Sequence, residues 1–103
     1  MYLVVFRNRK RADLDAAAYT ADAARMEALA AALPGFVSVK TFVAGDGEMV
    51  TLSEWASAAA AKAWGQHPDH ATVQQRGKNE YYEEYTLYSC TEPVMRRFER
   101  TGA

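Results

Sequence analysis

The residues FVSVKTFVAGDGEMVTLSEW, at positions 36–55, have the pattern of a β-hairpin. Its first eight residues alternate between two sets of side chains, which a strand turns to opposite faces. The Asp46-Gly47 pair in the middle is a strong hairpin signal, because both residues tolerate the positive φ of tight hairpin turns. We therefore expect two antiparallel strands, over residues 36–43 and 48–55.

A strand and a helix precede this hairpin. Residues 2–9 alternate as a strand does. In residues 14–33 apolar side chains recur at steps of three and four, which defines one face of a helix, and the Pro-Gly pair at 34–35 ends it. Asp13 stands where a side-chain oxygen would cap the first backbone N–H groups of this helix.

A second helical region and a fourth strand follow the hairpin. Ser57 can cap a helix over the alanine-rich residues 58–64, and Pro68 opens a shorter helical piece over residues 69–78. Residues 81–90 alternate and are rich in tyrosine, which favours a strand. The order βαββαβ is an α+β, ferredoxin-like fold, in which the helices cover one face of a four-stranded antiparallel sheet.

The sheet face without helices needs another cover. We expect Phe36, Phe42 and the tyrosines of residues 81–90 to leave an apolar patch there that a monomer would not tolerate. Packing a second sheet against it is the usual remedy, so we expect a homodimer. Pro93 ends the last strand, which predicts one domain over residues 1–92 and a tail over residues 93–103, either mobile or crossing to the partner subunit.

Composition excludes several classes of partner. Twelve Lys and Arg against thirteen Asp and Glu give a net charge of -1, so no basic field attracts nucleic acid or an anionic membrane. The longest apolar run, residues 28–33, is far shorter than the ~20 residues that span a bilayer, and no leader precedes the first strand. The single cysteine, Cys90, fits a reducing compartment. We therefore expect a cytoplasmic protein.

Short motifs spread along the chain form a further pattern. They are PGF at 34–36, LSEW at 52–55, AW at 63–64, HPDH at 67–70 and YYEEY at 81–85. Together with the hairpin they resemble the antibiotic biosynthesis monooxygenase family over nearly the whole chain. The resemblance implies a dimeric α+β barrel, in which two ferredoxin-like sheets pack face to face and each protomer encloses an apolar cavity. The family includes oxygenases of aromatic polyketides and quinols that use no cofactor, haem-degrading oxygenases, and members with no assigned reaction.

Two subgroups of the family can be compared residue by residue. The haem degraders carry an Asn near the end of the first strand, a Trp on the second helix and an axial His ten residues later. Asn8 and Trp64 match, but Gln74 takes the place of the His, and an amide does not replace an imidazole on iron. The polyketide oxygenases carry a cavity Trp, which Trp55 matches, and an Asn four residues earlier, where Thr51 keeps one hydroxyl donor.

These comparisons nominate two sets of site residues for the oxidation of a small aromatic molecule. Trp55 shares a strand face with Thr51 and offers an aromatic wall with an indole N–H donor. One of the two histidines would be the base, since histidine titrates near neutrality. The candidate catalytic residues are Asn8, Trp55, His67 and His70, and the candidate substrate-binding residues are Phe6, Phe36, Thr51 and Trp64.

Each nomination has a structural alternative. Trp55 could serve packing alone, and Asn8 could form a backbone bond at the end of its strand. His67 and His70 could lie at a helix start or in a dimer contact. As a metal site they would need third and fourth ligands, for which Glu80, Glu83 and Glu84 are candidates.

The sequence therefore predicts an oxygenase without a bound prosthetic group or metal. No Gly-rich phosphate loop is present for flavin or nicotinamide, because Gly45 and Gly47 belong to the hairpin. We expect the substrates to be molecular oxygen and a phenolic, quinol or polyketide-like aromatic. The alternatives are a dimer that binds a small apolar ligand without chemistry and, third, a haem-degrading oxygenase.

Overall fold

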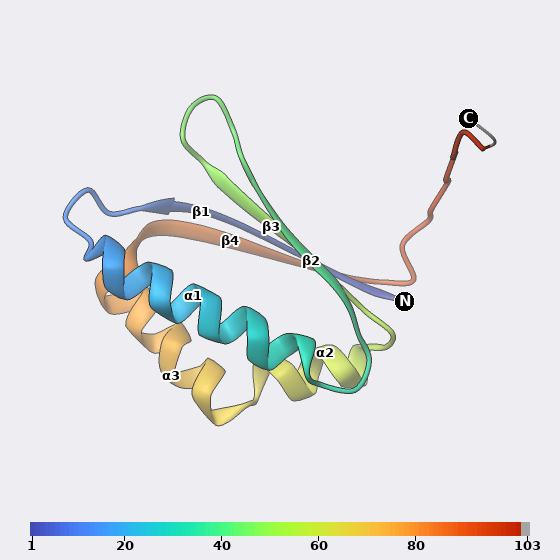
Figure 1. Cartoon of the computed structure of the whole chain (residues 1–103), viewed down its shortest axis with the longest axis horizontal. Helices are drawn as coiled ribbons and strands as arrows, with labels where there is room; N and C mark the ends of the chain where they lie inside the picture. The colour runs from blue at the N-terminus through green and yellow to red at the C-terminus, as the bar shows by residue number, and fades with distance from the viewer. Residues whose placement is uncertain (102–103) are drawn as a thin grey trace.

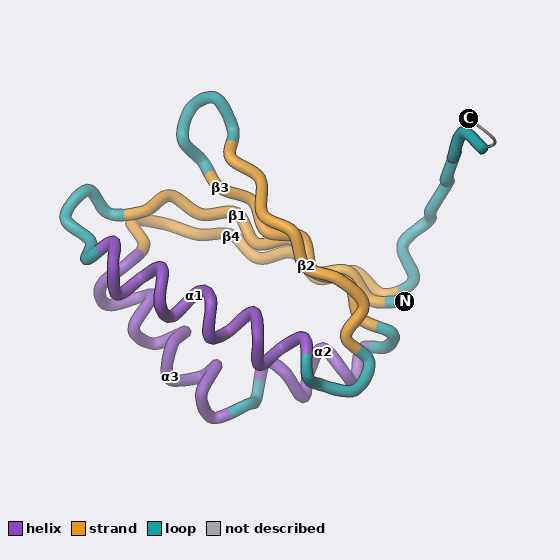
Figure 2. The backbone as a smooth tube through the Cα atoms, viewed as in Figure 1, coloured by secondary structure: helices purple, strands orange, loops and turns teal. Residues whose placement is uncertain are grey.

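The computed structural model describes residues 1–101 and confirms the predicted βαββαβ order. Within these residues the elements are β1 (Tyr2–Lys10), α1 (Ala16–Ala31), β2 (Phe36–Val43), β3 (Met49–Trp55), α2 (Ala58–Gly65), α3 (Pro68–Arg76), the π-helical turn η1 (Gly77–Tyr81) and β4 (Tyr82–Thr91) (Figure 2). The four strands form one antiparallel sheet in the order β2-β3-β1-β4. All three α-helices lie against one face of it (Figure 1).

Strand register decides which side chains meet the helices. Phe6 of β1 pairs with Thr51 of β3 on one side and with Leu87 of β4 on the other, so these three side chains lie on one face. We call this helix-covered face the inner face and the opposite one the open face. On the open face Val5 of β1 pairs with Leu52 and Tyr88.

A bulge in β2 corrects the predicted position of Phe36. Phe36 pairs with Trp55 but Ser38 pairs with Glu54, so Val37 is an extra residue without a partner. This extra residue reverses the alternation of β2 side chains between the two faces of the sheet. Phe36 therefore lies on the inner face, with its ring centroid 5.6 Å from that of Trp55. The prediction that Phe36 shares the open face with Phe42 is therefore wrong.

The first helix begins later than predicted. Its N-cap is Asp15, whose side chain accepts from the Ala18 N–H at 3.0 Å, and not Asp13. Asp13 instead holds the Arg11 guanidinium through two hydrogen bonds of 2.9 Å. Because Arg11 binds the carboxylate of Asp13, the carboxylate of Asp15 caps the helix instead.

The later caps follow the predictions more closely. Ser57 caps α2 by accepting from the Ala60 N–H, and Pro68 is in the first turn of α3. The predicted helical piece over 69–78 ends at Arg76, and η1 carries the chain to β4. The fourth strand therefore begins at Tyr82, not at residue 81, because Tyr81 belongs to the π-helical turn.

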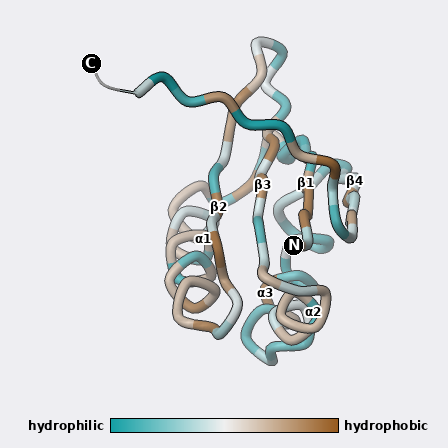
Figure 3. The backbone as a smooth tube through the Cα atoms, turned by 90° about the vertical axis from the view of Figure 1, so that its right-hand side faces the viewer, coloured by the Kyte–Doolittle hydropathy of each residue, from teal (hydrophilic) through white to brown (hydrophobic). Residues whose placement is uncertain are grey.

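The two ends of the chain are joined beside the sheet. The Glu92 N–H donates to the Met1 carbonyl at 2.8 Å, and the Met1 ammonium donates to the Glu92 carboxylate at 2.9 Å. Beyond this point the chain leaves on the side of the sheet away from the helices (Figure 1), and it mixes hydrophobic with hydrophilic residues (Figure 3). Val94 is 96% exposed. Residues 102 and 103 of the predicted tail lie outside the described residues.

The helix layer has one close approach to the loop before β2. Gly35 has φ +85°, and a Cβ there would stand 2.5 Å from the Cβ of Ala60 on α2. Glycine is therefore required both by its backbone conformation and by the space available. No helix within residues 1–101 is long and apolar enough to cross a membrane.

We predict that Gly35→Ala lowers the free energy of unfolding by about 2 to 4 kcal/mol, from left-handed strain and overpacking together. The measurement is urea unfolding followed by circular dichroism. Gly45→Ala is the matched control, because Gly45 lies in the hairpin and a methyl group added there would meet nothing within 4 Å. Equal stability of the two variants would contradict the packing of this loop on α2.

Candidate active site

A cavity of about 750 Å³ lies between the inner face of the sheet and the helices. This volume falls within the range of small-molecule sites in proteins. All four strands contribute to its floor, and α1, α2 and α3 supply its walls. Tyr85 and Leu87 of β4 line it and are also exposed, Leu87 by 55%, so the cavity opens to solvent along the β4 edge.

The structure brings most of the predicted site residues together here. The side chains around the cavity include Phe6, Phe36, Thr51, Trp55, Trp64 and His70. Asn8 is buried at 3% exposure but does not line the cavity, and its Oδ1 accepts from the Lys10 ammonium at 3.1 Å. His67 is the N-cap of α3, where its Nδ1 accepts from the Asp69 N–H. These two residues therefore have local structural partners outside the cavity.

An aromatic wall closes one end of the cavity. It consists of Phe36, Trp55, Trp64 and His70. Trp55, at 1% exposure, lies with its ring centroid 6.5 Å from that of Trp64 and 24° from parallel. The His70 ring stacks on Trp64 at 4.1 Å and 11°. Flat apolar faces of this kind suit a planar aromatic ligand.

His70 is the titratable group of this wall. Its Nδ1 lies 3.0 Å from the Trp64 carbonyl oxygen, and because a carbonyl only accepts, Nδ1 carries the proton. Burial lowers the pKa of His70 from its usual 6.5, opposed by the bond to Trp64, so the ring is neutral at pH 7. No residue in the described part of the chain bonds Nε2, which is thus free to accept a proton.

Hydroxyl groups stand on the floor beside the wall. The Trp55 Nε1–H donates to Ser53 Oγ at 3.3 Å, and the hydroxyls of Thr41 and Thr51 lie 2.9 Å apart. Thr51 was nominated from the family pattern, whereas Ser53 was not nominated as a site residue. Its position two residues before Trp55 on the same strand face is the signal that marks it.

Tyrosines form the other end of the cavity. Tyr82 packs edge-on against Phe6 at 5.4 Å and against Tyr19 at 6.3 Å, and the Lys10 ammonium lies 4.5 Å from the centre of the Tyr19 ring. Burial, and after it the neighbouring Tyr19, raise the pKa of Tyr82, so its phenol stays protonated. Gly77 leaves room for this ring, since a Cβ there would stand 2.7 Å from a ring carbon of Tyr82. Neither Tyr19 nor Tyr82 was predicted from the sequence to line the cavity.

A buried carboxylate in the lining of the cavity, that of Asp22, ties the helices together. Asp22 Oδ2 accepts from the Tyr81 hydroxyl and from the Arg76 guanidinium, each at 2.6 Å. The bond from Tyr81 lowers the pKa of Asp22, burial opposes this, and Arg76 lowers it further. The ionised carboxylate therefore joins α1, α3 and η1 through charge-assisted hydrogen bonds.

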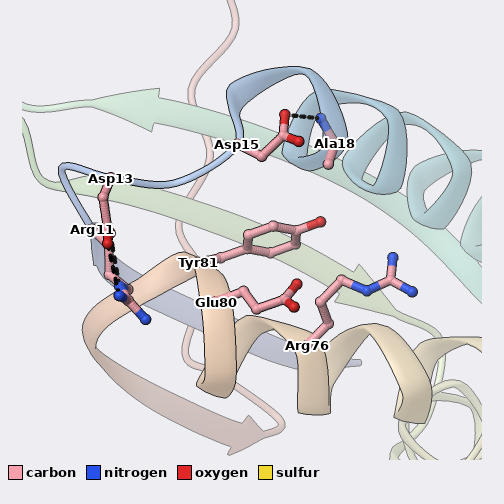
Figure 4. A pocket seen from close by; sticks show the side chains of 7 residues that line it. All are labelled: Arg11, Asp13, Asp15, Ala18, Arg76, Glu80 and Tyr81. Atoms are coloured by element: carbon pink, nitrogen blue, oxygen red, sulfur yellow. Dashed lines mark hydrogen bonds and ion pairs between the residues drawn. The ribbon is translucent and has the colours of Figure 1, made fainter.

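A second, smaller pocket of about 410 Å³ lies at the start of α1 (Figure 4). Three of its charged side chains already have partners, because Arg11 is bound to Asp13 and Asp15 caps the helix. It offers no aromatic wall and no base with a free nitrogen. Within residues 1–101 no three His, Cys, Asp or Glu side chains are grouped as metal ligands would be.

Comparison with known proteins gives a family and a fold. A family model described as antibiotic biosynthesis monooxygenase matches residues 1–76. The uncharacterized protein YqjZ of Bacillus subtilis (strain 168) is 34% identical over 98 residues, which cover 95% of this chain and 84% of that protein. The structure of Rv0793 from Mycobacterium tuberculosis is similar, with a TM-score of 0.78 at 19% identity over 92% of this chain and 96% of that one. Another, described as an antibiotic biosynthesis monooxygenase, has a TM-score of 0.76 at 12% identity over 91% and 100%.

We predict that Tyr81→Phe lowers the free energy of unfolding by about 1.5 to 3 kcal/mol at pH 7, the usual worth of a hydrogen bond to a charged group. Tyr85→Phe is the control, because Tyr85 is exposed. The folded pKa of Asp22 lies below its usual 3.8, so this stabilisation is complete above pH 3.8 and is lost as the pH falls through the lower value. Thermal unfolding across pH 2 to 7 measures both effects, and a constant gap between variant and wild type would contradict the ionised Asp22.

Proposed function

The chain belongs to the antibiotic biosynthesis monooxygenase family, and on that premise we propose that it oxidises a small phenolic or quinol-like aromatic with His70 as the base. One observation carries the proposal: a neutral imidazole with a free Nε2 stands in an aromatic-walled cavity of suitable size. A base of this kind works best when its pKa lies near the operating pH.

Binding would use the aromatic wall and exclude water. The substrate ring would lie among the side chains of the aromatic wall, with its hydroxyl facing His70. Loss of water around the hydroxyl strengthens every hydrogen bond in the cavity, because the local dielectric constant falls. The hydroxyl pair of Thr41 and Thr51 lies on the floor, where one proton can be donated to a developing oxyanion.

The proposed reaction begins with a proton transfer. Nε2 of His70 takes the proton of the substrate hydroxyl, and the resulting anion is electron-rich at a ring carbon. This carbon passes one electron to molecular oxygen, and the two radicals combine to form the C–O bond of a peroxide anion. The protonated His70 returns its proton to the terminal oxygen, which gives a hydroperoxide and restores the base. The hydroperoxide loses water, so one oxygen atom remains on carbon as a carbonyl and the other leaves in water.

The electrons balance within the substrate. The ring position, counted as CH₂ in its keto form, exchanges two hydrogens for one oxygen atom, and one O₂ is consumed for each water released. All four electrons that reduce O₂ come from that carbon, so the reaction needs no bound prosthetic group. Haem cleavage is not proposed, because Gln74 lines the cavity where haem degraders carry their axial His.

We further propose that the open face of the sheet pairs with that of a second copy. Phe42 and Tyr88 are exposed there, beside the half-buried Leu52. The segment after Glu92 leaves on this same side, with Val94, Met95 and Phe98 exposed, and would continue along the partner subunit. Burying these side chains between copies removes an apolar surface that a monomer would leave in water.

We predict a mass near 23 kDa by light scattering at micromolar concentration, twice the 11.4 kDa of one chain. Leu52→Asp should yield a monomer, because it places a charge in the centre of the paired face. Ala24→Asp, on the exposed surface of α1, is the control and should leave the dimer intact. Removal of residues 93–103 should weaken the dimer. A wild-type mass near 11 kDa would contradict the assembly.

We predict that His70→Asn lowers the rate of oxygen consumption with the best quinol of a panel by about 100-fold or more, as loss of a general base does. The wild-type rate should be flat near neutrality and should fall at low pH with a midpoint below 6.5, because protonation of His70 removes the base. This acidic limb should be missing from the residual rate of the variant. Rates come from an oxygen electrode.

His67→Asn is the matched control for this experiment. Asparagine keeps an N-cap acceptor for α3, and His67 does not line the cavity, so the rate should stay close to that of wild type. If both variants oxidised the substrate at the wild-type rate, the base would be wrongly assigned. If no quinol were oxidised but ligands still bound, the protein would be a binding dimer.

A further inference from the structure

The burial of Trp55 constrains a neighbouring hydroxyl. The Trp55 side chain is 1% exposed, and its one polar atom, Nε1, can only donate. A buried donor without an acceptor is strongly unfavourable, so this N–H needs a partner. Ser53 Oγ provides it at 3.3 Å. The oxygen of this hydroxyl is therefore an acceptor in the folded chain.

The proton of the same hydroxyl is left over. Oγ of Ser53 makes no second hydrogen bond to any residue in the range 1–101. Ser53 lines the cavity and is half-buried on the inner face. Because the indole N–H occupies one lone pair of Oγ, the O–H of Ser53 can point into the cavity. An occupant that carries an acceptor there would receive a hydrogen bond.

Other hydroxyls of the floor differ in this respect. Thr41 and Thr51 bond to each other and either can be the donor, so the pair does not fix which of its two protons is left over. Ser89 lies on the same rung as Ser53, since Val4 pairs with both, but no indole holds it. Ser53 is thus the hydroxyl that a buried donor pre-orients. A group oriented in advance loses less entropy when a ligand binds.

We propose that Ser53 donates a hydrogen bond to a second oxygen of the aromatic substrate, and that Trp55 is the positioning residue that directs it. This inference rests on the proposed function, in which the first oxygen is the hydroxyl that faces His70. It narrows the substrate class to aromatics with two oxygens, one a hydroxyl and the other an acceptor. The Trp55 N–H also polarises the Ser53 hydroxyl, which strengthens its donation.

Two ligands of similar shape test the inference without turnover. 4-Methoxy-1-naphthol offers a hydroxyl and an acceptor oxygen, whereas 4-ethyl-1-naphthol offers the hydroxyl alone. Titration calorimetry without oxygen gives both dissociation constants for the full chain. Wild type should prefer the methoxy compound by about threefold to tenfold, the effect of one neutral hydrogen bond.

Three variants test whether the Ser53 hydroxyl is the group that donates to the ligand. Ser53→Ala should bind both naphthols equally, Ser53→Thr should keep the preference, and Ser89→Ala should behave as wild type. The indole N–H resonance of Trp55 should move in Ser53→Ala, whereas that of Trp64 should not. Assignment of the two resonances comes from a Trp55→Phe variant.

The outcomes distinguish this inference from the proposed function. If both naphthols bind wild type with the same affinity, or if Ser53→Ala keeps the preference, the donor role of Ser53 is overturned and the proposed function stands. An unmoved Trp55 resonance in Ser53→Ala overturns the positioning role. If neither naphthol binds wild type, the proposed function fails and this inference fails with it.

Discussion

The register in which β1 pairs with β3 and β4 determines which side chains line the cavity. It places Phe6, Thr51 and Leu87 on one rung, and the alternation of each strand then assigns every other side chain to the inner or the open face. A shift by one residue would move Trp55 and Ser53 to the open face and replace them with Glu54 and Leu52. The cavity exists only in the observed register.

The sheet forms the floor of the cavity, and the helices supply the base, His70. α2 carries Trp64, and the break between α2 and α3 turns the chain so that His70 stacks on that indole and bonds its carbonyl. The same contact supplies two chemical properties at once. It sets which nitrogen carries the proton, and the burial that comes with it keeps the ring neutral. In the same cavity, the hydrogen bonds of Asp22 to Arg76 and Tyr81 join α1 to α3 and η1.

Much of the fold could be predicted because it follows from local rules. The Asp46-Gly47 turn, the Ser57 cap and the alternation that puts Trp55 on the same face as Thr51 each depend on residues close in sequence. The errors arise where one residue breaks a period or where two groups compete. The bulge at Val37 moves Phe36 to the inner face, and Arg11 takes Asp13 from the helix. For the site, spacing could nominate His67 and His70 equally, and only the path of α3 shows that one caps and the other lines the cavity.

The proposed chemistry requires His70 to be a neutral base whose Nδ1 carries the proton and whose Nε2 is free. Nitrogen-15 spectroscopy of the histidine rings, followed across pH 4 to 8, measures this most directly. We expect that at pH 7 the Nδ1 of His70 is protonated and its Nε2 is not, and that the ring gains its second proton with a midpoint below 6.5. A ring with its proton on Nε2 at pH 7, or with a midpoint at or above 6.5, would contradict this claim.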